Sequence, residues 1–142
     1  MLLTRSTVDA GLSTYRVKNH YQRIRPFMEN SNSTCKPEHE DILKEDGSYP
    51  SGYSAIGWML ALVLTDLVPE KQDPLLKRSY EYGQSHVVCR THWQSDTTAG
   101  RVMASATFAR LQSDPTFAAQ LKLARAEIAY MPQDSIPQLS AK

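Results

Sequence analysis

Apolar residues recur at helical intervals along most of the chain, and no stretch alternates with the two-residue period of a β-strand. The pattern predicts helices over about residues 7–22, 51–67, 73–89, 96–111 and 114–131. Three of these segments also begin with residues that favour a helix N-terminus, namely Ser51, Asp73-Pro74 and Asp114-Pro115. We therefore expect an all-α fold, a bundle of helices around a single hydrophobic core.

The helical pattern is lost between Ile24 and Pro50, where prolines, a glycine and the polar run at residues 30–34 interrupt it. We expect a long loop here, and loops of this length in compact domains are often functional. Residues 1–131 should form one helical domain, followed by a flexible tail over residues 132–142. The core is expected to contain Ile56, Leu60, Leu64, Val102, Ala106, Phe117 and Leu121.

Composition narrows the classes of function. The 142 residues suit one domain, and 16 basic against 15 acidic residues give no basic excess for nucleic acid. The most apolar run, residues 56–68, is shorter than a membrane span and is interrupted by Asp66. The first residues lack the apolar segment of a signal peptide. Two cysteines neither require nor exclude a disulfide.

The stretch around the start of the fourth predicted helix carries candidate chemistry. His92 and Asp96 are four positions apart, so on a helix they would share one face. An aspartate that accepts from one imidazole nitrogen fixes the tautomer and leaves the other nitrogen free to attack. Alone, such a pair is more often a structural hydrogen bond than a catalytic dyad.

Two further elements could bind an oxyanion. Lys18 and Arg25 are seven positions apart, close to two helical turns, and would share a face if the first helix extends that far. Ser51-Gly52 opens a helix, where a hydroxyl and backbone N–H groups favour an anion. The alternatives are a solvated basic face for the cations and an ordinary N-cap for Ser51.

Together these elements resemble the signature of the class A bacterial non-specific acid phosphatases, in the wider family of type 2 phosphatidate phosphatases and vanadium haloperoxidases. That signature runs Lys-x6-Arg-Pro, then Pro-Ser-Gly-His, then Ser-Arg-x5-His-x3-Asp. The corresponding residues here are Lys18…Arg25-Pro26, Pro50-Ser51-Gly52-Tyr53 and Ser85-His86…His92…Asp96. The resemblance extends over about residues 9–129 and includes the residues that flank each motif.

The resemblance implies a helical bundle of the acid phosphatase type and a phosphoryl-transfer site. It assigns His92 as the nucleophile that forms a phosphohistidine and Asp96 as its orienting partner. It places the phosphate oxygens against Lys18, Arg25, Ser51 and the Gly52 amide, with no metal or other cofactor. It also implies a phosphomonoester substrate, inorganic phosphate as product, and a periplasmic location.

Two positions depart from the family signature. Tyr53 stands where the family has the histidine that protonates the leaving oxygen, and a phenol with a pKa of about 10 is a poor acid. His86 stands where the family has an arginine, so we expect it to bind phosphate only when protonated. Arg90, four positions later, could compensate on a continuous helix, although an ordinary surface arginine is the commoner case.

These departures leave three functions open. The first is an acid phosphatase with impaired activity, and the second is a non-catalytic relative that binds phosphate. The third is a vanadate-dependent haloperoxidase, because vanadate mimics the phosphoryl transition state, but no residue here favours halide chemistry.

The resemblance also raises expectations about assembly and cysteines. Family members carry helices before the lysine motif that this sequence lacks, so an apolar face should be uncovered. We therefore expect self-association into homo-oligomers, or low stability. In a periplasmic relative, Cys35 and Cys89 could form a disulfide; an unpaired Cys89 would be a small core residue.

Overall fold

The computed structural model describes residues 1–131, and the tail expected over residues 132–142 lies outside the described residues. The α-helices are α1 (Leu2–Tyr21), α2 (Pro26–Glu29), α3 (Glu40–Lys44), α4 (Gly52–Leu67), α5 (Gln72–Val88), α6 (Gln94–Leu111) and α7 (Pro115–Tyr130). Short 3₁₀ turns occur at Pro37–His39 and Pro69–Lys71. Residues 1–131 contain no strand, which confirms the predicted all-α class.

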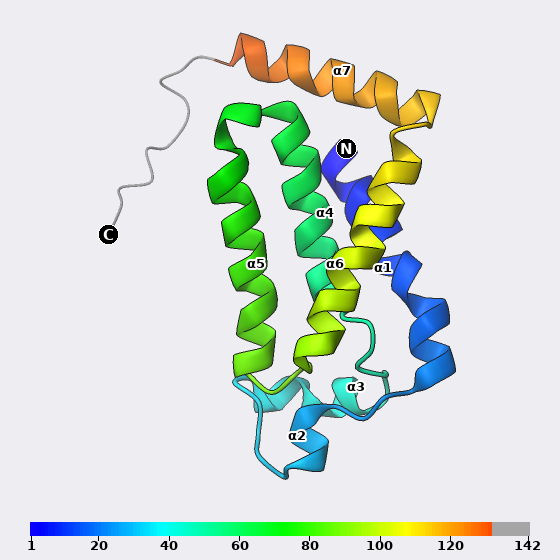
Figure 1. Cartoon of the computed structure of the whole chain (residues 1–142), viewed down its shortest axis with the longest axis vertical. Coiled ribbons are helices and arrows are strands. Elements are labelled where there is room, and N and C mark those ends of the chain that lie inside the picture. Colours follow the sequence, from blue (N-terminus) through cyan, green and yellow to red (C-terminus); the bar gives the residue numbers. More distant parts are fainter. Residues whose placement is uncertain (132–142) are drawn as a thin grey trace.

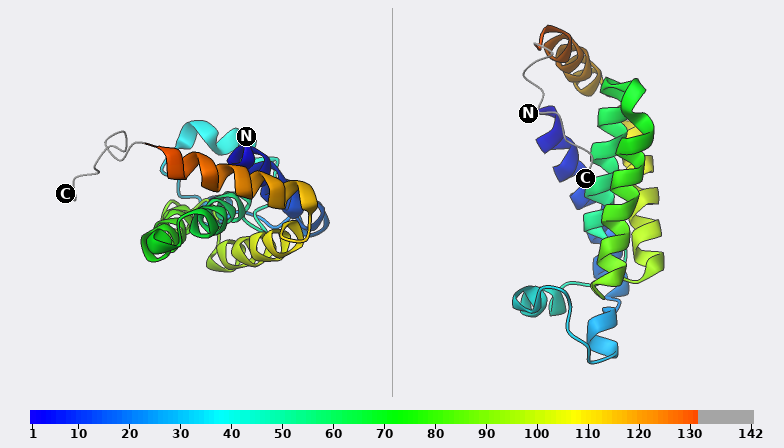
Figure 2. Two further views of the ribbon diagram at one scale, coloured as in Figure 1. Left: turned by 90° about the horizontal axis from the view of Figure 1, so that it is seen from above. Right: turned by 90° about the vertical axis from the view of Figure 1, so that its left-hand side faces the viewer.

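The four long helices α1, α4, α5 and α6 run along the length of the molecule, and α4 contacts each of the other three (Figure 1). Helix α7 crosses one end of this bundle, and the segment with α2 and α3 covers the opposite end (Figure 2). Side chains from α1, α4, α6 and α7 form the core: Leu2, Ala10, Ala55, Met59, Val63, Ala104, Phe117 and Leu121. None of the helices within residues 1–131 is both long and apolar enough to cross a membrane.

Helix starts agree with the sequence pattern at two of the three predicted caps. Ser51 caps α4, accepting a hydrogen bond from the Ser54 N–H at 3.2 Å, and Asp114 caps α7 by accepting from the Thr116 and Phe117 N–H groups. Asp73 was wrongly predicted as a cap. The 3₁₀ turn at Pro69–Lys71 leads directly into α5, so that helix begins at Gln72 and Asp73 lies within its first turn.

The predicted core is correct for α7 and wrong for α6. Phe117 and Leu121 are buried, whereas Val102 is 62% exposed and Ala106 is also exposed. Helix α6 instead turns Gly100 and Ala104 toward α4. The two pairs are offset by two positions, about 200° around the helix, and therefore lie on opposite faces. Ile56, Leu60 and Leu64 are only partly buried, and they line a groove between α4 and α5.

Gly100 allows α6 to approach the start of α4 closely. A Cβ at this position would collide with the Ser51 carbonyl oxygen and would also crowd the Ala55 nitrogen. At the same contact, the Ser51 N–H donates to the Asp96 carbonyl oxygen at 3.0 Å. The close approach therefore holds two of the expected site residues, Ser51 and Asp96, next to each other.

The segment predicted as a long loop contains short helices, so the prediction of an irregular loop is only partly correct. Helix α1 ends at Tyr21, and Gln22 adopts the left-handed conformation with φ of 42°. Residues 23–51 contain α2, α3 and a 3₁₀ turn within irregular chain, each too short to show a periodic pattern. A disulfide between Cys35 and Cys89 ties this segment to the end of α5, which settles the pairing that the sequence left open.

Candidate active site

His92 and Asp96 come together in a way that the sequence did not predict. His92 lies in the bend between α5 and α6, and Asp96 lies in the first turn of α6, so the pair does not share a helix face. Both side chains are fully buried. The His92 N–H donates to the His86 carbonyl oxygen at 3.1 Å, which holds the bend against the last turn of α5.

Asp96 is held from three directions. Its Oδ2 accepts from the Trp93 N–H at 2.8 Å and lies 3.5 Å from His92 Nδ1, a long separation for a hydrogen bond. Its Oδ1 accepts from Arg23 Nη1 at 2.8 Å. Burial alone would raise the pKa of Asp96, but His92, the Trp93 N–H and the Arg23 charge together lower it below the ordinary value. Asp96 is therefore an anion that faces Nδ1 of the imidazole.

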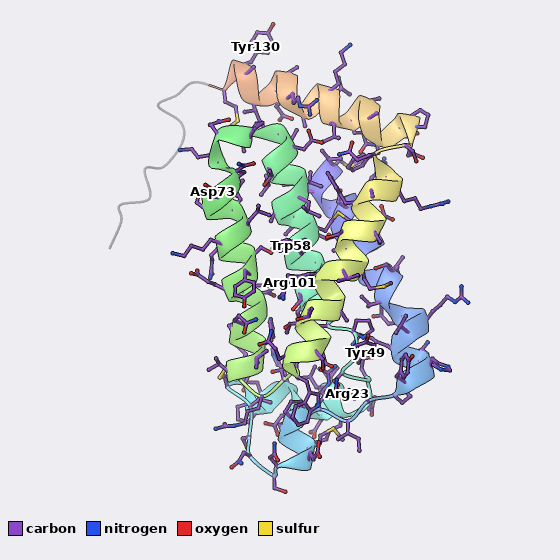
Figure 3. All side chains as sticks on the ribbon, viewed as in Figure 1. Arg23, Tyr49, Trp58, Asp73, Arg101 and Tyr130 are labelled. Carbon is purple, nitrogen blue, oxygen red and sulfur yellow. A yellow bond between two sulfur atoms is a disulfide. The ribbon has the colours of Figure 1, made fainter. Side chains whose placement is uncertain are left out.

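Arg23 was not among the residues expected at the site. Its guanidinium also lies over the Trp93 ring, 5.4 Å from the ring centroid. The residue lies at the end of the bundle away from α7 and Tyr130 (Figure 3). In sequence, Arg23 is one of several basic residues around the end of α1, and no local signal separates it from the solvated ones.

Arg25 contacts the other side of the His92 ring. Its Nη1 lies 3.2 Å from His92 Nε2. Arginine can only donate, so this contact requires a lone pair on Nε2 and places the proton of the neutral ring on Nδ1, toward Asp96. Burial lowers the pKa of His92, and the Arg25 and Lys18 charges lower it further against the opposing effect of Asp96. The ring is therefore neutral, with an unprotonated Nε2 beside a cation.

The Arg25 side chain is fixed by backbone carbonyl groups from separate segments. Its Nε donates to the Leu43 and Asp46 oxygens at 2.8 and 3.0 Å, and its Nη1 donates to the Thr91 oxygen at 3.1 Å. These bonds join the segment before α2, the α3 segment and the bend that carries His92. These hydrogen bonds hold the buried guanidinium in place although Arg25 itself does not lie within a helix.

Lys18 and Arg25 converge, but not along one helix face as expected. Because α1 ends at Tyr21, Arg25 reaches the site through the turn that follows. Lys18 Nζ donates to the Gly47 carbonyl oxygen at 2.6 Å and lies 3.3 Å from Asp46 Oδ2. Burial lowers the pKa of Lys18, which Asp46 partly offsets.

A cavity of about 230 Å³ brings most of the expected site residues together. Its walls include Lys18, Arg25, Gly52, Tyr53 and His92. Ser51 and Asp96 are fully buried beside it and support the wall rather than form it. Asp46, which the sequence analysis did not single out, lines the same cavity.

His86 lies next to this cavity and not in its wall. It lines a neighbouring cavity of about 360 Å³, and Tyr53 separates the two. The His86 and Tyr53 rings are stacked with centroids 4.5 Å apart, and Tyr82 meets His86 edge-on. Burial, with smaller contributions from His92 and Arg25, lowers the pKa of His86 to about 4. At pH 5 most His86 side chains are neutral, so the cation expected here forms only in more acidic solution.

The lowered pKa of His86 predicts an acid-labile fold. As the pH falls, His86 becomes protonated near pH 6.5 in the unfolded chain but only near pH 4 in the folded chain. The contribution of neutral His86 to the free energy of unfolding is therefore complete above pH 6.5 and is lost between these two values. After allowance for partial solvent exposure, the loss is roughly 2 kcal/mol. Urea unfolding at pH 7 and pH 4.5 should show a smaller decline for His86→Gln than for wild type. An equal decline in wild type and His86→Gln would contradict this prediction. The matched control is His20→Gln, because His20 is exposed.

Arg90 does not supply the missing cation. It follows the end of α5 with a left-handed backbone, φ of 60°, so the helix that would have aimed it at His86 has already ended. Its Nη1 donates to the Ser33 carbonyl oxygen at an exposed position. Arg90 therefore ties down the segment beside the disulfide, as a surface arginine.

Comparison with known proteins identifies acid phosphatases as relatives of this chain. A non-specific acid phosphatase of Providencia stuartii is 51% identical over 129 residues, which cover 90% of this chain and 52% of the relative. A non-specific acid phosphatase of Salmonella typhimurium is 45% identical over 128 residues, covering 90% and 51% respectively. An acid phosphatase of Zymomonas mobilis is 41% identical over 113 residues, covering 80% and 43%. The chain spans about half the length of the curated relatives that it matches.

The family model described as the PAP2 superfamily matches residues 1–115, a stretch that contains every site residue described above. Together with the relatives, it confirms the family that the three motifs indicated. The chain belongs to the PAP2 superfamily and is a relative of its non-specific acid phosphatases.

Proposed function

We propose that this chain carries the active site of an acid phosphatase that hydrolyses phosphomonoesters through a phosphohistidine on His92. The observation that carries the proposal is the contact of 3.2 Å between His92 Nε2 and the buried Arg25, in a cavity that Lys18 and Gly52 also line. An imidazole lone pair beside fixed cations suits attack on a phosphorus atom whose oxygens those cations bind.

The reaction would proceed in two displacements. In the first, the Nε2 lone pair forms a bond to phosphorus as the bond from phosphorus to the ester oxygen breaks, and the leaving oxygen takes up a proton. In the second, water attacks phosphorus and gives a proton to the group that had protonated the leaving oxygen, the bond to Nε2 breaks, and inorganic phosphate leaves. Asp96 would stabilise the ring while it is positively charged, through the proton on Nδ1, and the distance of 3.5 Å between Nδ1 and Oδ2 would shorten as that charge forms.

The cations and the start of α4 would bind the transferred group. Lys18 and Arg25 would pair with the phosphoryl oxygens, and the Gly52 N–H in the first turn of α4 would donate to one of them. Ser51, as the buried N-cap, would hold that turn in place. Positioning and charge stabilisation are most of what phosphoryl transfer requires, so these groups need no metal.

Tyr53 would be the group that protonates the leaving oxygen. Its ring centroid lies 6.0 Å from that of His92, in the wall of the same cavity. A phenol is a weak acid at the pH where such enzymes work, so we propose an activity that is impaired for poor leaving groups. The same substitution supports a second candidate, a relative that binds phosphate without turnover.

A phosphatase assay across pH 4–8, with p-nitrophenyl phosphate and purified chain, separates the two candidates. Turnover above that of the His92→Ala blank supports the enzyme. Stoichiometric phosphate binding without turnover supports the binding relative. The names of the curated relatives favour the enzyme, because they are acid phosphatases.

The location and assembly that we propose follow from two surface features. The Cys35–Cys89 disulfide suits an oxidising compartment such as the periplasm. Helix α1 exposes the apolar side chains of Val8, Leu12 and Tyr15, which flank a shallow groove that also contains Ile56. We propose that this apolar face supports homo-oligomers.

Self-association predicts a molar mass above that of the 16.0 kDa monomer in light scattering after gel filtration. Leu12→Glu should shift the protein toward monomer because it places a charge on the apolar face, whereas a charge at exposed Ile42 on α3 should have a smaller effect. A monodisperse monomer at high protein concentration would contradict the proposal.

A further inference from the structure

We propose that Asp46 is a built-in counter-ion of the phosphate cradle, the group of phosphate-binding donors formed by Lys18, Arg25 and the Gly52 N–H. The Asp46 carboxylate must leave when phosphate binds, so that Asp46 sets the affinity for substrate and product. One carboxylate oxygen, Oδ2, lies 3.3 Å from Lys18 Nζ and 3.3 Å from Arg25 Nη2. A single oxygen thus bridges the two cations that would bind a phosphoryl oxygen. The inference rests on the proposed function, because it concerns the same cradle.

The position of Asp46 corresponds to that of a ligand. Its side chain lines the cavity that contains His92, and a carboxylate oxygen shared by a lysine and an arginine makes the contacts that a phosphate oxygen makes in such sites. Phosphate cannot accept from the same N–H groups while the carboxylate occupies them. If Asp46 stayed nearby, it would also repel the incoming anion at short range.

The cations do not depend on Asp46 for their placement. Lys18 keeps its bond of 2.6 Å to the Gly47 oxygen, and Arg25 keeps its bonds to the Leu43 and Thr91 oxygens. These acceptors are neutral backbone carbonyl groups, so they orient the N–H donors without cancelling their charge. Removing the carboxylate charge should therefore leave the cradle assembled and more positive.

The exposures of the three side chains point to which group moves. Lys18 and Arg25 side chains are 5% and 1% exposed, whereas the Asp46 side chain is 44% exposed. The cations are fixed in the wall, and the carboxylate can turn into water at the mouth of the cavity. A strongly hydrated anion at an exposed position is the group with the smaller cost of displacement.

Calorimetric titration with inorganic phosphate tests the inference. Asp46→Asn keeps the side-chain shape and an acceptor oxygen but removes the charge. We expect the variant to bind phosphate about tenfold more tightly than wild type, because phosphate no longer has to displace one charge-assisted contact between the Asp46 carboxylate and the cations. The matched control is Asp41→Asn, which removes the same charge from α3, where Asp41 pairs with Lys44 at 2.9 Å instead of with the cradle. That control should leave phosphate affinity unchanged.

If the Asp46 carboxylate instead held Lys18 and Arg25 in place, Asp46→Asn would weaken phosphate binding. Equal or weaker phosphate binding by Asp46→Asn would overturn the inference. In turnover, Asp46→Asn should lower KM and the inhibition constant of phosphate together, without a matching gain in kcat, a division that mere destabilisation would not produce.

The outcomes also separate this inference from the proposed function. Tighter binding by Asp46→Asn in a chain that shows no turnover would keep the counter-ion and reject the enzyme. Turnover by wild type with weaker binding by the variant would keep the enzyme and reject the counter-ion. If Asp46→Asn does not fold, carboxyl ¹³C NMR of the wild type is the second measurement. Phosphate should then move the Asp46 resonance toward that of a solvent-exposed aspartate, and an unmoved resonance would overturn the inference.

Discussion

His92→Ala is expected to abolish phosphomonoester turnover, with a loss in kcat on the order of 10⁴–10⁶, the effect of removing the nucleophile from a covalent hydrolase. The reason is geometric. Nε2 is the one imidazole nitrogen that faces the cations, while Nδ1 faces Asp96. Without His92, the remaining cations Arg25 and Lys18 offer no nucleophile that could form the covalent intermediate. The measurement is kcat for p-nitrophenyl phosphate in wild type and variant.

The intermediate itself gives a second measurement. Wild-type protein quenched in alkaline denaturant during turnover should carry one phosphoryl group on the peptide that contains His92, because phosphohistidine survives base and is lost in acid. His20→Ala is the matched control, since His20 is exposed on α1. Retained activity in His92→Ala, or a phosphoryl group on another residue, would reject the proposed mechanism.

Tyr53→His is expected to raise the hydrolysis of alkyl phosphates by a factor on the order of 10²–10⁴, the usual contribution of a positioned general acid. A nitrophenolate leaves without protonation, whereas the alkoxide of a sugar or nucleoside does not. The gain on p-nitrophenyl phosphate should therefore be small. The measurement is kcat/KM for both substrates at pH 5–6, where an imidazole of ordinary pKa is still largely protonated.

Two results would change this interpretation of Tyr53. Equal gains on both substrates would mean that Tyr53, whose ring lies in the wall of the cavity, disturbs phosphate binding and not the proton transfer. No gain on either would favour the non-catalytic candidate. Tyr53→Phe is the control: it keeps a ring that can stack on His86 and removes only the hydroxyl group, so it should lower alkyl hydrolysis further if Tyr53 acts as a weak acid.

The sequence predicts the long helices well because their apolar residues repeat with the helical period. The period does not reveal which face is buried: on α1 the repeating Val8, Leu12 and Tyr15 are exposed, and smaller or polar residues such as Ala10 and Thr14 are buried instead. It predicts the face of α6 poorly. Val102 and Ala106 suggest an apolar stripe, but the contact with α4 is made by Gly100 and Ala104, whose small size permits a close approach that hydrophobicity does not reveal. The short helices α2 and α3 complete too few turns to show a period.

The site shows the same division. The residues of the family motifs could be listed from sequence, and the cavity contains most of them. Their geometry could not be derived from spacing, because His92 and Arg25 both lie outside the helices assumed to carry them. Arg23 and Asp46 were missed, since each acts through contacts with residues far away in the chain, Asp96 for one and Lys18 for the other.

The carbonyl groups around Arg25 have a consequence for how this site can evolve. Because Arg25 joins Leu43, Asp46 and Thr91 through their backbone oxygens, the side chain that would bind substrate is also what closes three segments into one fold. Such a position has little freedom to vary, as any change made to adjust affinity would also loosen the protein. Adaptation to a new substrate or phosphate concentration would instead fall on side chains such as the Asp46 carboxylate, which contacts the charge while the backbone oxygen of Asp46 keeps the segments joined.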